Sequence, residues 1–149
     1  MTNEQLISML QDDLKNERKH LGFYLHASVM LQGLHRKELR EFCEEEAKGE
    51  FRHVIEFSEA IVHLGGVPGL ETNYFPTYKK PHTILTYAQG MESEVADIYA
   101  TRLVATHEME NAATAYMHVF YEDQIRDSWK TAQEIAQMLK GLIQPKSPN

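Results

Sequence analysis

The 149-residue sequence predicts an all-α protein, folded as an antiparallel four-helix bundle with a long crossover between its second and third helices. Two observations carry this prediction. Apolar residues recur every three or four positions along four long segments, which are residues 3–33, 36–64, 82–107 and 112–140. A stretch rich in proline and glycine separates the first two segments from the last two, and strand-like alternation persists nowhere.

The composition is that of one globular domain covering residues 1–149, with 42% hydrophobic and 25% charged residues. No apolar run approaches the roughly 18 residues of a membrane span. The first residues lack the pattern of a secretory signal, and the lone Cys43 excludes an internal disulfide, so we expect a cytoplasmic protein. A net charge of −7 disfavours non-specific binding to nucleic acid.

The first two predicted helices have clear stop signals. Gly33 ends the first helix, and Gly65, Gly66 and Pro68 follow the second. The expected inward residues of the first helix are Leu6, Leu10, Leu14, Leu21, Tyr24, Ser28 and Leu31. Those of the second are Phe42, Cys43, Ala47, Val54, Phe57 and Ile61.

The crossover and the second pair of helices follow. Residues 65–81, at about 3.3 Å each, reach far enough to run the length of a long helix, which makes the second and third helices parallel. The apolar repeat of the third helix runs through Leu85, Ala88, Val95, Tyr99 and Leu103. We place the turn between the third and fourth helices near residues 107–111. The fourth keeps a heptad with Ala115, Glu122, Trp129 and Ala136 at one position and His118, Ile125, Ala132 and Leu139 three residues on.

Acidic residues on these inward stripes indicate a metal site. Glu50 and His53 form a Glu-x-x-His pair on the apolar face of the second helix, and the other three helices each have one inward glutamate, Glu17, Glu92 and Glu122. Four carboxylates cannot all stay ionised in a low-dielectric core without cations. Buried tyrosines, Tyr24 and Tyr99, each two turns after a glutamate, are candidates to hydrogen-bond these carboxylates.

Several motifs resemble the ferritin-like superfamily, and within it bacterioferritin and rubrerythrin. They are Leu14-x-x-Glu17, Tyr24-Leu25-His26-Ala27, Glu45-Glu46-Ala47-x-x-Glu50-x-x-His53 and Leu64-Gly65-Gly66-Val67-Pro68. The resemblance implies a ferritin-like bundle with two iron ions, or manganese. It makes Glu17 and Glu92 terminal or bridging carboxylates, Glu50 a bridge, His53 a ligand of one metal and Glu122 the fourth carboxylate.

The chain departs from the family in its fourth helix. The family's second Glu-x-x-His would place a histidine where Ile125 stands. The one-residue shift to Asp123 and Arg126 turns that pair away from the core, so Glu122 is preferred. His20 and His118 remain open as substitute ligands, and we expect unequal metal sites, firm near His53 and weak near Glu122.

Further departures from the family limit which cofactors the protein is expected to bind. Phe51 replaces the methionine of haem-binding bacterioferritins, so no haem is expected. The tail after Leu139 is too short for a fifth helix, and one cysteine cannot form the four-cysteine iron module of rubrerythrin. These differences argue against a 24-subunit cage and against rubredoxin-type electron transfer.

The leading functional prediction is a ferroxidase-type oxidoreductase that oxidises Fe(II) with O2 or H2O2, for iron storage or detoxification. We expect a homo-oligomer, at least a dimer. One alternative is a rubrerythrin-like peroxidase or another di-metal oxidoreductase. The other is a non-catalytic helical bundle that binds other proteins and pairs its inward acids with Arg or Lys.

Overall fold

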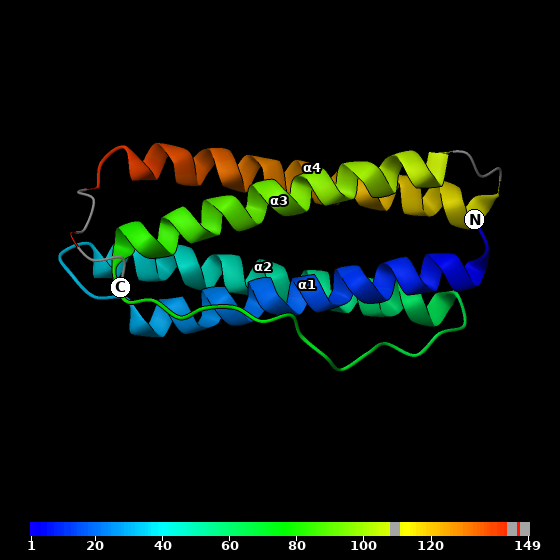
Figure 1. The fold of residues 1–149 in the computed structure, drawn as a ribbon, viewed down its shortest axis with the longest axis horizontal. Helices are drawn as coiled ribbons and strands as arrows, with labels where there is room; N and C mark the ends of the chain where they lie inside the picture. Colours follow the sequence, from blue (N-terminus) through cyan, green and yellow to red (C-terminus); the bar gives the residue numbers. More distant parts are fainter. Residues whose placement is uncertain (108–110, 143–145, 147–149) are drawn as a thin grey trace. The chain divides into compact units, whose positions relative to one another are not determined.

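The computed structural model describes residues 1–107, 111–142 and 146, and within them the chain forms four α-helices (Figure 1). These are α1 (Asn3–Met30), α2 (Arg36–His63), α3 (Pro81–His107) and α4 (Ala112–Leu139). Their ends lie within three residues of the predicted ones. No helix in the described part of the chain is long and apolar enough to cross a membrane.

The ends of α1 show how local sequence sets the helix boundaries. Thr2 and Gln5 form a capping box at its start, in which each side chain accepts a hydrogen bond from the other residue's backbone N–H. At the other end the helix stops at Met30, three residues before the predicted end. Gly33 lies in the following turn with φ of 108°, a value that glycine adopts readily.

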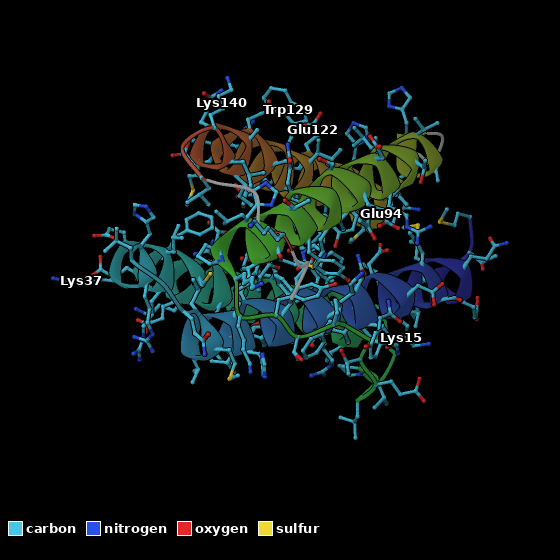
Figure 2. All side chains as sticks on the ribbon, turned by 60° about the vertical axis from the view of Figure 1, so that its left-hand side comes forward. Lys15, Lys37, Glu94, Glu122, Trp129 and Lys140 are labelled. Carbon is cyan, nitrogen blue, oxygen red and sulfur yellow. The ribbon has the colours of Figure 1, made fainter. Side chains whose placement is uncertain are left out.

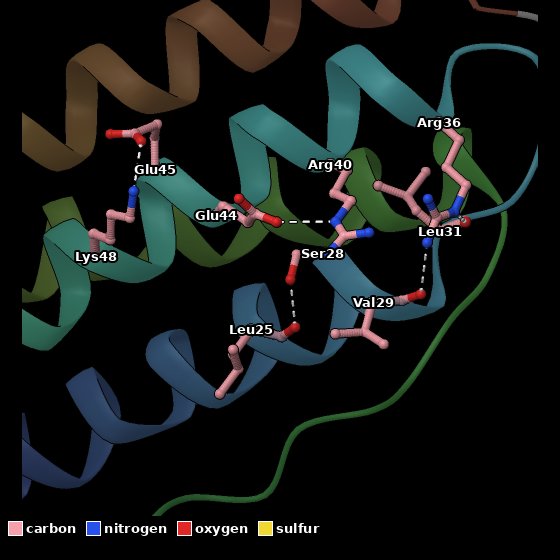
Figure 3. Close-up of polar contacts among 9 residues, drawn as sticks. All are labelled: Leu25, Ser28, Val29, Leu31, Arg36, Arg40, Glu44, Glu45 and Lys48. Carbon is pink, nitrogen blue, oxygen red and sulfur yellow. Dashed lines mark hydrogen bonds and ion pairs between the residues drawn. The ribbon is translucent and has the colours of Figure 1, made fainter.

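Arg36, at the start of α2, closes the carboxyl end of α1. Its guanidinium donates hydrogen bonds to the carbonyl of Leu31 (2.8 Å) and to that of Val29 (3.4 Å) (Figure 3). A helix leaves its last carbonyls without helical partners, so this contact satisfies two of them and ties α2 to α1. The two helices pack against each other, and together with residues 64–80 they form one compact unit.

Residues 64–80, here called the strap, run along α1 from its first turns to its end. The Gln11 side chain donates to the carbonyl of Val67 (2.7 Å) and accepts from the backbone N–H of Gly69 (2.8 Å). At the far end the backbone N–H of Gln32 donates to the carbonyl of Lys79 (3.0 Å). The prediction of a long crossover that follows a helix is therefore confirmed.

Phe75 of the strap makes an apolar contact with α1. Its ring lies against Gly22, where an added Cβ would approach ring carbons to 2.5 Å. Gly22 therefore makes room for Phe75, while Tyr74 beside it is exposed.

The second compact unit holds α3 and α4. Tyr99 of α3 and Tyr121 of α4 pack with ring centroids 5.5 Å apart. Asn111 caps α4 by accepting a hydrogen bond from the backbone N–H of Thr114 (3.0 Å). The turn predicted at residues 107–111 is bounded as expected by His107 and Asn111, and its residues 108–110 lie outside the described residues.

The heptad predicted for α4 is wrong at its first position, whereas Ala132 at its second position is buried as predicted. Ala115, Glu122 and Trp129 are exposed, and the side chains of Glu122 and Trp129 are labelled on α4 in Figure 2. The buried residues of this helix are Thr114, Met117, Phe120, Tyr121, Gln124, Ser128, Ala132 and Ile135. Apolar residues occur on both faces of α4 and polar ones are buried, so polarity alone pointed to the wrong stripe.

Candidate metal centre

Two Glu-x-x-His pairs lie buried in the middle of the α1–α2 hairpin. Glu17 and His20 belong to α1, and Glu50 and His53 to α2; none is more than 6% exposed. Residues three apart share one face of a helix, so each glutamate has its histidine beside it. The sequence predicted all four residues as ligands or candidate ligands, and the structure brings them together.

Glu17, Glu50 and His53 form a tight cluster. His53 Nδ1 lies 3.3 Å from Glu50 Oε2 and 3.4 Å from Glu17 Oε2. One ligand atom from each of the three residues lies within 4.8 Å of those of the other two. The second oxygen of Glu50, Oε1, lies 3.9 Å from Nδ1 of His20. Glu50 is thus placed between the two histidines.

The proton affinities in this cluster are strongly altered. Burial raises the pKa of Glu17 to about 7, with further contributions from the charge of Glu50 and a hydrogen bond to it, and His53 and His20 offset part of this rise. Burial alone would lower the pKa of His53. Hydrogen bonds to Glu17 and Glu50, and their charges, outweigh it and raise the pKa to about 11.

The donor set fits a divalent transition-metal ion. In the absence of metal, a protonated His53 supplies the positive charge between two buried carboxylates. A metal ion would supply more charge at the same place and would accept electron pairs from both carboxylates and the neutral imidazole. Mixed carboxylate and imidazole ligands suit Fe(II) and Mn(II), and a cluster of three protein ligands leaves coordination positions open.

Other predicted site residues are buried in the expected places. Glu92 lies on the buried stripe of α3 between Ala88 and Val95 and is 1% exposed. Tyr24 and Tyr99 are fully buried. The roles predicted for Glu92 as a metal ligand, and for the two tyrosines as hydrogen-bond donors to carboxylates, stay predictions.

Glu122 does not have the predicted inward position. Its side chain is 52% exposed and lies 3.7 Å from Nε2 of His118, one turn earlier on α4. His118 is partly exposed, and its ring packs against that of His107 with centroids 5.3 Å apart. Because α4 is rotated relative to the predicted heptad, we withdraw Glu122 as the fourth carboxylate.

The buried pair that sequence reasoning missed on α4 is Tyr121 and Gln124. These two have the i, i+3 spacing of a Glu-x-x-His motif but carry a phenol and an amide. The available signal was the polar pair Gln124 and Ser128, which lie four residues apart, about one helical turn. Within α4, therefore, no histidine or acid is fully buried.

Comparisons with known proteins agree with this fold. A family model described as the ferritin-like domain matches residues 7–142. A ferritin-like diiron-carboxylate protein from Bacillus anthracis is 27% identical, with a TM-score of 0.85, and the match covers 93% of this chain and 99% of that one.

More distant structures share the fold. A dodecameric thioferritin from Bacteroides fragilis is 19% identical (TM-score 0.70, covering 97% and 94% of the two chains), and a bacterioferritin from Mycobacterium tuberculosis is 18% identical (TM-score 0.80, covering 91% and 84%). Among curated proteins none matches. The family match over residues 7–142, with the structural likeness, shows that this chain belongs to the ferritin-like domain family and has its four-helix bundle fold, with a long loop between α2 and α3.

Proposed function

We propose that the protein binds Fe(II) as its substrate at Glu17, Glu50 and His53 and oxidises it to Fe(III) with O2 or H2O2. The observation that carries this proposal is the buried cluster of two carboxylates and one imidazole on a ferritin-like hairpin. The similar protein from Bacillus anthracis, described as a diiron-carboxylate protein, supports the choice of iron.

The residues of the cluster favour the oxidised ion. Glu17 and Glu50 together balance the two charges of Fe(II), and in a buried site their negative charge stabilises the additional positive charge of Fe(III). Each Fe(II) loses one electron, and two electrons with two protons convert O2 to H2O2 or H2O2 to two waters. Two irons are therefore consumed per oxidant molecule, and the open coordination positions give the oxidant access.

Anaerobic titration of the metal-free protein with Fe(II), followed by a pulse of O2 or H2O2, tests the proposal. We expect wild-type protein to bind Fe(II) and to form Fe(III), seen as near-ultraviolet absorbance. Glu50→Gln should lose both, because the amide carries no charge. The matched control is Glu45→Gln on the same helix, where the side chain is 72% exposed and pairs with Lys48 (Figure 3).

The outcomes separate the candidate functions. Wild-type protein that binds no Fe(II), and whose melting temperature does not change with Fe(II) or Mn(II), would refute the proposal and favour a metal-free interaction protein. Repeated turnover of H2O2 by reduced protein without accumulation of Fe(III) would favour a peroxidase. Accumulation of a ferric product favours storage or detoxification, and light scattering of the same sample measures the expected homo-oligomer.

A further inference from the structure

The two oxygens of Glu50 face two different histidines. Oε2 approaches His53, and Oε1 approaches Nδ1 of His20. We propose that His20 is a metal ligand, and that it supplies the nitrogen of a second metal position on the opposite side of Glu50. This inference rests on the proposed function, because it assigns a second ion to the same iron site.

The contact between His20 and Glu50 has the length expected of two ligands on one ion. At 3.9 Å it is too long for a direct hydrogen bond. Metal–ligand bonds to imidazole nitrogen and carboxylate oxygen are roughly 2.1 Å, so two ligands of one ion lie up to about 4.2 Å apart. A carboxylate can chelate one ion with both oxygens or hold one ion with each. Because the two oxygens of Glu50 face different histidines, Glu50 would be able to hold one ion on each side.

His20 is also the available buried nitrogen donor. Among the described residues, His20 and His53 are the fully buried histidines. On α4, the buried residues with the spacing of a Glu-x-x-His pair are Tyr121 and Gln124, and His118 is 28% exposed and pairs with Glu122. The structure thus favours His20 over His118 as the substitute for the histidine that α4 lacks. The α1–α2 hairpin then supplies the histidines of both metal positions.

The two positions should differ in affinity. The hairpin provides Glu17, Glu50 and His53 to the first position, and Glu50 and His20 to the second. The hairpin thus places two carboxylates at the first position and only the shared Glu50 at the second. More negative charge attracts a cation more strongly, so the first ion should bind at His53 and the second at His20.

Optical titration with Co(II) tests the assignment in the full-length protein, because its absorption reports each bound ion. Wild-type protein should bind two ions per chain with unequal affinity. His20→Gln should weaken the second ion by about 10- to 100-fold or more and leave the first unchanged. His53→Gln should weaken the first. His118→Gln is the matched control and should bind both ions as wild type does.

A second measurement needs no variant. In wild-type protein with ¹⁵N-labelled histidine, titrated with Zn(II), the His53 resonance should shift at the first equivalent and that of His20 at the second. Failure of wild-type protein to bind Co(II) would refute the proposed function together with this inference. Binding of one ion per chain, unchanged second-ion affinity in His20→Gln, or loss of an ion in His118→Gln would overturn the role of His20 alone.

Discussion

Metal binding at the cluster of Glu17, Glu50 and His53 should release protons, because two of its ligands hold them in the metal-free protein. Near pH 7, Glu17 with a pKa of about 7 is partly protonated, and His53 with a pKa of about 11 is protonated. A metal ion displaces both, so the first ion should release between one and two protons at pH 7.

The sign of the pH dependence follows from this count. Protons compete with the metal at low pH, so the dissociation constant should fall as pH rises, by about one to two powers of ten per pH unit between pH 6 and pH 8. Above pH 8, where Glu17 is ionised, the slope should approach one proton, which is that of His53.

Calorimetric titration with Mn(II) at pH 6, 7 and 8, in two buffers of different ionisation enthalpy, counts the protons directly. His53→Gln should release fewer protons than wild type, because glutamine holds none, but by less than one, because Glu17 without His53 binds its proton more tightly. Glu45→Gln should release the wild-type number. Release of less than half a proton per ion at pH 7 by wild-type protein would show that His53 is not a protonated ligand and would refute the reasoning.

Three further predictions concern the rest of the molecule. Burial raises the pKa of the Cys43 thiol to about 12, so a disulfide reagent at pH 8 should label this thiol only in denaturant. Above pH 9 the thiol ionises in the unfolded chain and not in the folded one, so the free energy of unfolding should fall progressively. Rapid labelling of the native protein would contradict both expectations. Gln11→Ala removes two side-chain hydrogen bonds to the strap and should lower the free energy of unfolding in urea by about 1–2 kcal/mol. Gln32→Ala keeps its backbone hydrogen bond to Lys79 and should lower that free energy by less than about 0.5 kcal/mol. Equal losses for the two variants would refute the strap contact. Trp129→Ser should change the free energy of unfolding by less than about 0.5 kcal/mol, because Trp129 is exposed. Tyr121→Ala should lower that free energy by roughly 3–5 kcal/mol, because Tyr121 is fully buried. The reverse order would support the heptad predicted from sequence.

Features that depend on neighbouring residues in the chain were predictable from the sequence. The four helices follow from apolar spacing, and the end of α2 follows from Gly65 and Pro68, because glycine and proline act on the backbone where they stand. The pairing of Glu50 with His53 on one face is likewise a property of the helix itself. The strap could be predicted because its length and its lack of helical repeat are visible in the sequence.

The orientation of α4 could not be predicted in this way. Trp129 is apolar and exposed, while Gln124 is polar and buried, so hydrophobicity alone does not distinguish the inner face from the outer one. Which face is buried depends on what packs against the helix, and that is a property of the folded chain. The error on Glu122 followed from this, because one residue along a helix turns a side chain by about 100°.

By itself, then, the sequence determined four helices, their approximate ends, and a helix face on which Glu50 and His53 lie together. The sequence also marked Glu17 and His20 as candidate ligands, but only tertiary structure decided which atoms of these side chains face one another. The packing of α1 against α2 places Glu17 beside His53 and His20 beside the other oxygen of Glu50, at distances set by two backbones remote in the chain. Spacing along one helix carries no information about that approach, because it arises only when the apolar faces of both helices are buried together.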